Sequence, residues 1–246
     1  MDFLYIVASH KNSELDSLDL PFLEICNFSP VINPTGYNFY DNSYAINISS
    51  KNLAYCELSS LYSIWKNDFN YKMIGLGHYR RFLDFSAKTN QHHFLNKSLK
   101  DRKAISKHLE KYMPVLENAF YAASPINVGS ILDNFKLHHP QLYDFFEYSF
   151  DVFEKQNPNI FNIKNFFKNS GQLSICNMFY GSKDIVDQWC NQIFNLLFEL
   201  EKNAPTDLDH YQSRWAGFFA ERYMSFFISQ ISNKVNVTYK PIIYFE

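Results

Sequence analysis

The clearest indication of the fold is the stretch Tyr71-Lys-Met-Ile-Gly-Leu-Gly-His-Tyr-Arg-Arg81. Residues 71–77 form a short apolar run, typical of a strand buried on both faces, and the run stops at polar residues. Residues 3–8 repeat this pattern, because an apolar, partly β-branched run stops there at Ser9-His10-Lys11. In open α/β sheets, ligands lie outside the carboxyl ends of the strands. The residues that follow these two runs are therefore the first candidates for a binding site.

Further elements alternate outward from these two strands. Residues 15–43 are rich in Pro, Asn, Asp and Ser, so we expect an irregular segment with at most short helical turns. A polar stretch over 86–111 is expected to hold a short helix and a mobile loop. Strands that alternate with helices predict one α/β domain with a mostly parallel mixed sheet, flanked by helices and covered on both faces. The spacing of apolar residues predicts helices over 49–67, 140–155, 183–202 and 209–231 and strands over 115–124, 173–180 and 234–239.

Composition and motifs exclude several classes of protein. The chain has 23 Lys and Arg residues against 25 Asp and Glu residues, so it lacks the basic field that attracts nucleic acid. It contains none of the motifs of P-loop nucleotidases, dinucleotide oxidoreductases or serine hydrolases. Its cysteines have none of the short spacings of zinc sites, and we expect them to be reduced core residues of a cytoplasmic protein: Cys26, Cys56, Cys176 and Cys190.

From the sequence we expect neither a secretory signal nor a membrane span. No basic region precedes the first apolar run, and no window approaches the ~20 uninterrupted apolar residues of a spanning helix. We therefore expect any contact with a membrane to be peripheral, at the inner face of the cytoplasmic membrane.

Positive charge gathers at the end of the second strand. His78, Arg80 and Arg81 would place an imidazole and two guanidinium groups in a crevice, where guanidinium groups bind a diphosphate bidentately. The alternative is that one arginine pairs with a surface carboxylate and His78 packs at the sheet edge. His10 and Lys11 follow the first strand and are expected near the same crevice.

Two carboxylates lie in predominantly apolar helices. Asn47 and Asn52 flank the start of the helix that carries Glu57, where free N–H groups bind an anion unless the asparagines only cap the helix. Glu221 has almost entirely apolar neighbours, so it must be paired or neutralised. An ion pair with Arg222 or Arg214 is the favoured interpretation, and a role as catalytic base is the alternative.

Two other polar pairs are poor candidates for a metal site. His138 and His139 are adjacent, so their side chains diverge, and no further ligand follows at a metal-binding spacing. Asp207-Leu208-Asp209 has the D-x-D pattern that holds Mg²⁺ or Mn²⁺, yet it follows Pro205 and opens a helix. Helix capping explains the aspartates better.

Several stretches together resemble one family of proteins. They are similar, in the same order, to the capsular-polysaccharide and lipopolysaccharide glycosyltransferases long catalogued as a domain of unknown function. The likeness covers nearly the whole chain, and its most specific parts are HYRR after an apolar strand and the ELxxLYxxWKN helix. Gly77 stands where we expect Cys or another small residue. The stretches are YIVASHK, NISSKNLAYCELSSLYSIWKND, YKMIGLGHYRRFLDF, CNMFYGSK and DHYQSRWAGFFAERYMSFF.

The resemblance implies a single Rossmann-like domain of the GT-A type over 1–246. Its nucleotide-sugar-binding half would span residues 1–125 and its acceptor half residues 126–246. The implied substrates are a nucleotide-activated sugar, such as a UDP-linked galactose, and a glycan or lipid-linked glycan of the capsule, O-antigen or lipopolysaccharide. The implied donor-binding residues are His10, Lys11, Asn47, Asn52, Glu57, His78, Arg80, Arg81, Asn177 and Met178, with Arg214 and Arg222 in support.

The chemistry of transfer adds two expectations. In enzymes of this fold a D-x-D motif holds a metal against the diphosphate, whereas here cationic side chains follow the strand. We therefore expect that Mg²⁺ or Mn²⁺ is not strictly required. Inversion at the anomeric carbon needs a general base, for which Glu221 and His138 are the candidates.

Two other classes of function stay open from the sequence. One is a carbohydrate- or nucleotide-binding module without turnover, whose aromatic residues stack on sugar rings. The other is a structural partner in a polysaccharide-assembly complex, which predicts a large exposed apolar patch and no pocket holding His78 and Arg80. The charges at the strand ends favour the enzyme.

Overall fold

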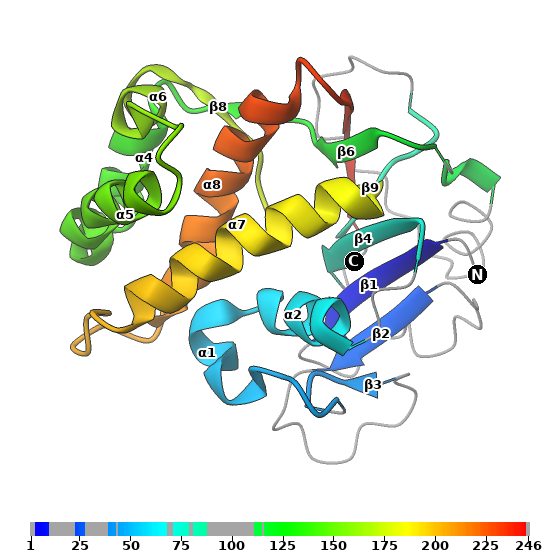
Figure 1. Ribbon diagram of the computed structural model, residues 1–246, viewed down its shortest axis with the longest axis horizontal. Helices are drawn as coiled ribbons and strands as arrows, with labels where there is room; N and C mark the ends of the chain where they lie inside the picture. Colours follow the sequence, from blue (N-terminus) through cyan, green and yellow to red (C-terminus); the bar gives the residue numbers. More distant parts are fainter. Residues whose placement is uncertain are drawn as a thin grey trace.

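A nine-stranded sheet runs through the molecule, and helices cover one of its faces (Figure 1). Its main path has the order β10-β6-β9-β4-β1-β2-β3, and β5 and β11 pair beside it. The computed structural model describes residues 3–9, 23–27, 39–42, 44–67, 71–78, 81–87, 111–114 and 116–244. The strands are β1 (Phe3–Ser9), β2 (Leu23–Asn27), β3 (Phe39–Tyr40), β4 (Met73–His78), β5 (Arg81–Leu83), β6 (Ala119–Ala123), β9 (Phe179–Ser182), β10 (Asn236–Lys240) and β11 (Ile242–Tyr244).

The two apolar runs of the sequence lie side by side as β1 and β4. They pair in parallel, with Ala8 opposite His78, so both strands end at the same edge of the sheet. β2 and β3 continue in parallel beyond β1, and β6 and β10 are parallel to each other. β9 is antiparallel to both of its neighbours, β4 and β6. The prediction of a mixed, mostly parallel sheet is confirmed.

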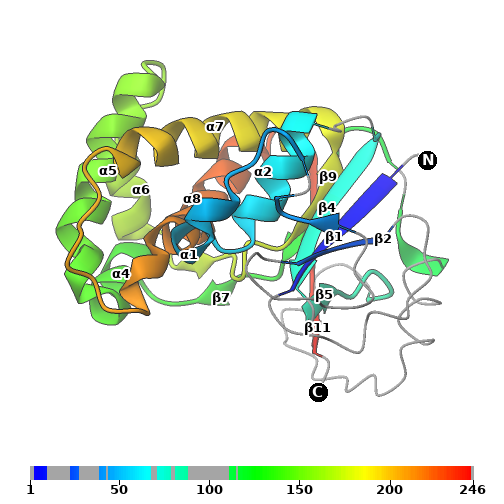
Figure 2. The same ribbon diagram turned by 90° about the horizontal axis from the view of Figure 1, so that it is seen from below.

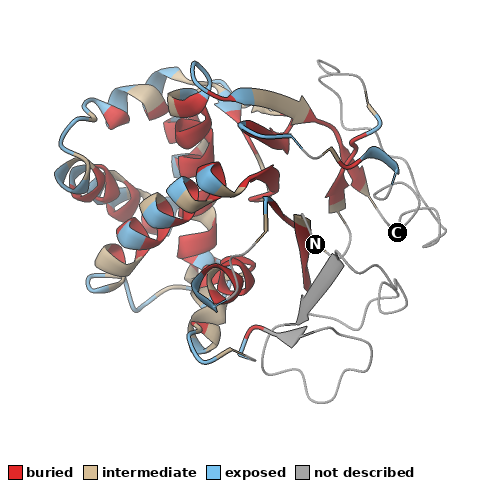
Figure 3. Ribbon diagram, turned by 45° about the vertical axis from the view of Figure 1, so that its right-hand side comes forward, coloured by how far each residue is buried: buried red, intermediate tan, exposed pale blue. Residues whose placement is uncertain are grey.

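The two faces of the sheet carry different covers. Leu4 and Ile6 belong to the large core shared with the helices, whereas Tyr5 and Val7 point to a smaller core on the other face. Phe82 of β5 and Ile242 of β11 cover that smaller core. The alternation follows from the period of two along a strand. Figure 3 shows the buried inner surfaces of the strands and helices.

Glycine is required where β4 passes under the ring of Tyr5. A Cβ atom at Gly75 would lie 2.5 Å from the Tyr5 ring, and one at Gly77 would lie 2.8 Å from it. Both distances are below any real contact, so the aromatic ring occupies the space that the missing side chains leave. The glycine before His78 is thus needed for packing.

Helices make up the other layer. α7 and α8 lie against the sheet, and α4, α5 and α6 gather beyond them (Figures 1 and 2). Of these, α4 and α6 were not predicted from the sequence. No helix in the described part of the chain is long and apolar enough to cross a membrane. The helices are α1 (Asn52–Tyr55), α2 (Leu58–Asn67), α4 (Ile131–His138), α5 (Tyr143–Gln156), α6 (Ile163–Asn169), α7 (Lys183–Glu201) and α8 (Trp215–Ile231), with short 3-10 turns η2 (Ser49–Lys51), η3 (Pro140–Leu142) and η4 (Gln212–Arg214).

Two predicted elements are interrupted in the structure. The helix expected over 49–67 breaks at Cys56, whose φ is 48°, into η2, α1 and α2. The strand expected over 173–180 is wrong: β8 (Gln172–Leu173) pairs with β7 (Ile126–Asn127), and β9 starts only at Phe179. Between them Cys176 and Asn177 have φ of 69° and 49°. Apolar periodicity does not reveal a left-handed residue, so these breaks were not predicted.

Other boundaries also differ from the sequence predictions. The segment 15–43 contains β2 and β3, so the expectation of an irregular segment without strands was wrong. The strand predicted over 115–124 is shorter, because β6 begins at Ala119. The segment predicted over 86–111 lies almost entirely outside the described residues.

Candidate active site

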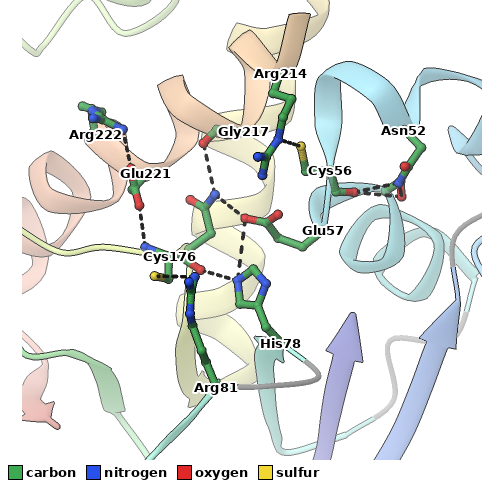
Figure 4. Close-up of polar contacts among 12 residues, drawn as sticks. Asn52, Cys56, Glu57, His78, Arg81, Cys176, Arg214, Gly217, Glu221 and Arg222 are labelled. Atoms are coloured by element: carbon green, nitrogen blue, oxygen red, sulfur yellow. Dashed lines mark hydrogen bonds and ion pairs between the residues drawn. The ribbon is translucent and has the colours of Figure 1, made fainter. Parts of the chain in front are cut away.

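A cavity of about 250 Å³ lies where β4 ends. His78 is the last residue of β4, and Arg81 begins β5. Because β9 is antiparallel to β4, the segment that leads into β9 lies at this same edge and brings Cys176 and Asn177 to the cavity. The N-terminal part of α8 supplies the opposite wall (Figure 4). The cavity is therefore built where a strand ends, as in other α/β folds.

The turn between α1 and α2 presents Glu57. Asn52 donates through Nδ2 to the carbonyl of Cys56 at 3.1 Å and to Ser59 Oγ at 2.9 Å (Figure 4). Ser59 Oγ donates in turn to Asp41, which is fully buried. These bonds hold Cys56 in a positive-φ conformation with φ 48° and ψ −130°, and such sparsely populated conformations cost ~1–3 kcal/mol for a residue with a Cβ. Asn52 is thus a residue that supports the shape of the turn.

Glu57 is the most buried carboxylate of the cavity, with 7% of its surface exposed. Asn177 donates through Nδ2 to Glu57 Oε1 at 2.7 Å and to the carbonyl of Gly217 at 3.1 Å. The same carboxylate oxygen lies 4.0 Å from His78 Nε2, which is 2.7 Å from the carbonyl oxygen of Cys176. No described residue bonds the other oxygen, Oε2. A buried carboxylate with one unbonded oxygen is suited to accept a proton.

Two arginines face the cavity, and among the described residues no carboxylate lies within ion-pair distance of either, although Glu57 acts on Arg214 from farther away. Arg81 donates to Cys176 Sγ at 3.3 Å, and Arg214 donates to Cys56 Sγ at 3.2 Å. Burial raises the pKa of Cys56 to about 11 and the pKa of Cys176 to about 12, so both thiols are neutral at pH 7. A neutral sulfur is a weak acceptor. The positive charge of both guanidinium groups is therefore available to an anionic ligand.

The second carboxylate, Glu221, is held on both sides. Its Oε1 accepts the backbone N–H of Cys176 at 2.5 Å, and its Oε2 pairs with Arg222 (Figure 4). Arg222 is 5% exposed and also stacks over the ring of Phe135. The pair joins α8 to the left-handed segment at Cys176. This geometry agrees with the structural ion pair that the sequence favoured for Glu221.

Aromatic rings line the part of the cavity that faces α4. His139 lies 4.1 Å from the ring centre of Phe218 and 5.8 Å from that of Tyr211. Tyr211 leaves 52% of its surface exposed, so one face of this aromatic group is open. Burial, together with the charge of Arg222, lowers the pKa of His139 from 6.5 to about 4. His139 is therefore neutral at pH 7; it packs between the rings, and its Nδ1 bonds Gln212 Oε1 at 3.1 Å.

The cavity brings together most of the residues that the sequence singled out. Asn47, Asn52 and Met178 lie outside its lining: Asn47 bonds Ser49, Asn52 bonds the Cys56 turn, and Met178 is fully buried in the smaller core. His10, Lys11 and Arg80 lie outside the described residues. The predicted residues in the lining are Glu57, His78, Arg81, His138, Asn177, Arg214, Glu221 and Arg222.

Six lining residues were not predicted as site residues. Cys56 and Cys176 were expected in the core, and this was wrong, because both are half-buried free thiols that contact arginines; Cys190 is a buried core residue as predicted. Their positions next to Glu57 and Asn177 were the only signal available. The six are Cys56, Cys176, Gly217, Phe218, Tyr211 and His139.

The capping prediction for Asp207 and Asp209 is met by Asp209 alone, and no described residue bonds the side chain of Asp207. Asp209 accepts through Oδ1 the N–H of Gln212, the first residue of η4, at 2.8 Å. In the part of the chain that the structure describes, no three His, Cys, Asp or Glu side chains gather in the geometry of a metal site. The candidate site is thus a cationic cavity with one available carboxylate.

Comparisons with known proteins give two matches. Residues 5–234 match the family described as "Domain of unknown function (DUF4422)". The solved structure described as "WbbM bifunctional glycosytransferase apo structure" has the same fold, with a TM-score of 0.84 at 20% sequence identity. That likeness covers 100% of this chain and 46% of the other, so this chain spans about half of that protein's length. No curated protein matches the sequence significantly.

Proposed function

We propose a glycosyltransferase function for this chain, which belongs to the DUF4422 family. It would transfer a hexose from a nucleotide-sugar donor, UDP-linked galactose in pyranose or furanose form being the first choice, to a growing cell-surface glycan. The acceptor would be a capsule, O-antigen or lipopolysaccharide chain, free or linked to lipid, at the inner face of the cytoplasmic membrane. The shared fold with a protein described as a bifunctional glycosyltransferase supports this proposal.

One observation carries the proposal: Arg81 and Arg214 face the same cavity, and among the described residues their guanidinium N–H groups donate only to thiols. Breaking the bond between a sugar and a nucleoside diphosphate leaves negative charge on the departing phosphate. Fixed cationic donors at the place where that charge develops lower the barrier without having to reorganise. Arginine suits this task because its planar fork matches phosphate oxygens.

The proposed step exchanges one bond for another. The acceptor hydroxyl oxygen attacks the anomeric carbon, and the bond from this carbon to the diphosphate oxygen breaks. The bonding electron pair leaves with the nucleoside diphosphate, whose added charge Arg81 and Arg214 offset. The hydroxyl proton moves to a carboxylate of the cavity. No further reactant is needed.

Glu57 is better placed than Glu221 to accept this proton. Both oxygens of Glu221 are engaged, one by a backbone N–H and one by Arg222. Glu57 has one oxygen fixed by Asn177 and the other without a partner among the described residues. We therefore assign the base to Glu57 and a positioning role to Glu221. His138 lines the same cavity, so it remains the alternative base.

The aromatic side of the cavity suits the acceptor. The open face of Tyr211, backed by Phe218 and His139, offers an apolar surface to the C–H face of a sugar ring. Arg214 stacks over Phe218, 5.5 Å from the ring centre, so this acceptor surface adjoins the cationic donor-binding groups. An acceptor sugar on the rings would therefore lie next to the diphosphate.

The proposal includes transfer without a strict requirement for a divalent metal. The guanidinium groups supply the electrostatic stabilisation that Mg²⁺ or Mn²⁺ provides elsewhere. Turnover should therefore persist in excess chelator. Activity that chelator abolishes and Mn²⁺ restores would refute this part of the proposal.

The test is incubation of the purified chain with UDP-, GDP-, CMP- and dTDP-hexoses. One nucleotide class should raise the melting temperature, because a ligand that binds only the folded state stabilises it. That donor should also release its nucleotide slowly in water and faster with an acceptor glycan. Stabilisation without any release would identify a binding module, and neither effect with any donor would refute the proposed function.

A further inference from the structure

A second hollow lies at the other end of α8. It is a groove of about 630 Å³ between α7, the C-terminal end of α8 and the end of α5. Gly217 lines the active-site cavity and Gln230 lines the groove. These residues are thirteen positions apart on one helix, roughly 20 Å at ~1.5 Å per residue. The groove is therefore a separate place on the surface.

The lining of the groove consists mainly of amides. Of its thirteen lining residues, eight are Asn or Gln, and Lys234 is the only charged one. By comparison, charged residues make up 20% of the whole chain, and such residues lie mostly on protein surfaces. The groove therefore has fewer charged residues than its position on the surface would predict. Each amide offers both a hydrogen-bond donor and an acceptor without net charge. The groove is built for neutral hydrogen bonding.

A stripe on α7 provides half of these amides. Gln188, Asn191, Gln192 and Asn195 follow the spacing i, i+3, i+4, i+7, which places them on one face of the helix. Asparagine is a weak helix former, so the stability of the helix does not account for the stripe. No described residue bonds the side chains of Gln188 and Asn195. The stripe thus keeps free donors and acceptors toward the groove.

Other amides are already oriented. Gln192 donates through Nε2 to Gln230 Oε1 at 3.3 Å, and Gln156 donates to the carbonyl of Asn195 at 3.1 Å. Each of these amides still has unused hydrogen-bonding capacity, because an amide group can make about four hydrogen bonds. These bonds fix amides from three helices in place. A ligand therefore meets a partly preorganised surface.

Beneath the amides lies an apolar floor. Ile185, Phe227, Ile231 and Val235 line the groove and are each at most 8% exposed. A sugar ring has hydroxyl groups on its rim and C–H groups on its faces, which match an amide wall above an apolar floor. A polyanion would require cations, and a nucleotide would require an open aromatic ring. The volume lies within the ~300–1,000 Å³ of typical ligand sites.

We propose that this groove binds an uncharged oligosaccharide segment. The proposal concerns binding alone and does not need the chain to be an enzyme. If the proposed function also holds, a glycan held in the groove raises the effective concentration of acceptor ends near the cavity. That consequence rests on the proposed function, whereas the groove itself can be tested separately.

The test uses arrays of immobilised neutral and anionic oligosaccharides, without any sugar donor. The wild-type chain should bind at least one neutral gluco-, galacto- or manno-oligosaccharide, and titration calorimetry then gives its Kd. The triple variant Gln188→Ala, Asn191→Ala, Asn195→Ala should raise that Kd at least about tenfold, which corresponds to a loss of about 1.4 kcal/mol of binding free energy. The variant should fold, because alanine favours the helix and the replaced side chains are exposed.

Two controls separate the groove from other surfaces. Asn159→Ala with Asn169→Ala removes exposed amides elsewhere and should leave the Kd unchanged. Lys168→Ala, on the exposed face of α6, should also leave it unchanged. The proposal would be overturned if the wild-type chain bound no neutral glycan or bound only anionic glycans. It would also be overturned if the triple variant bound as tightly as the wild type. Dimerisation of the chain that the triple variant abolishes would overturn it as well, since the groove would then be a protein interface.

Discussion

The two hollows at the ends of α8 differ in charge and in backbone strain. The active-site cavity holds guanidinium groups, two carboxylates and three of the left-handed residues, namely Cys56, Cys176 and Asn177. The groove holds amides, one lysine and a single left-handed residue, Asn118. Strained backbone is maintained only where the surroundings enforce it, and it gathers where side chains must be aimed. The comparison indicates that the cavity is built for charge and the groove for neutral contacts.

The largest expected effect distinguishes the two carboxylates of the cavity. Glu57→Gln removes the proton acceptor but keeps the size of the side chain, so kcat should fall roughly 10²–10⁴-fold. Initial rates of nucleotide release with acceptor measure this loss. The matched variant, Glu221→Gln, should mainly lower the free energy of unfolding, by about 1–3 kcal/mol, because it weakens the bond to Arg222. If the Glu57→Gln variant kept its activity, Glu57 would not be the general base, and His138 would be the next candidate.

The next effect tests whether positive charge is the essential feature of the cavity. Arg81→Ala should lower kcat about 10²–10³-fold, since one donor to the developing charge is lost. Arg81→Lys should recover only part of this, because an ammonium group cannot bind phosphate as a fork. Lys168→Ala, on the exposed face of α6, serves as the control with unchanged rates. Equal rates for wild type and Arg81→Ala would contradict the mechanism.

A smaller effect follows from the buried histidine of the cavity. Burial lowers the pKa of His139 from 6.5 to about 4. Between these two pH values the histidine is protonated in the unfolded chain but neutral in the folded chain. The free energy of unfolding should therefore be highest above pH 6.5 and fall toward pH 4, by at most about 3 kcal/mol. Chemical denaturation at several pH values measures the slope.

Two variants identify the residue responsible for that slope. His139→Phe keeps the ring packing and should flatten the pH dependence. His210→Gln removes an exposed histidine and should leave it as it is. A slope that survives in His139→Phe would show that another group titrates there.

The smallest effect concerns the amide stripe of the groove. Replacing Gln188, Asn191 and Asn195 by alanine should leave the free energy of unfolding unchanged or raise it by ~1 kcal/mol, because alanine is the better helix former. The melting temperature should stay the same or rise slightly. A marked loss of stability would show that the amides serve the fold. The comparison with Glu221→Gln then separates residues that hold the structure from residues kept for a ligand.

Much of the scaffold could be predicted, because it depends on patterns along the chain. β1, β4, α7 and α8 were predicted from apolar runs and helical spacing, and their burial follows the same patterns. The prediction of a strand over 173–180 was wrong, because the feature that interrupts it leaves no pattern along the chain. Its apolar residues belong to β8 and β9, but the left-handed pair between them has no apolar signature.

The candidate site was predicted in the same uneven way. His78, Arg81 and Glu57 stood out because charge follows a buried strand or lies in an apolar helix. The rings of Tyr211 and Phe218 did not, since aromatic residues are frequent throughout this sequence. The groove was not predicted at all, because half of its amides lie outside α7 and the stripe of four amides on α7 matches no known binding motif.

By itself, the sequence determined which segments are buried and which charges end a strand, since both depend on neighbouring residues. Only the tertiary structure decided which of these charges are paired. Arg222 and Arg214 are close in sequence, yet one faces Glu221 and the other faces a neutral thiol. The direction of β9 and the left-handed turns at Cys56 and Cys176 set those partners. The strength of an electrostatic interaction depends on the distance between the charges and on their burial, and both are set only by the folded structure. The chemical roles of these arginines therefore could not be read from the sequence.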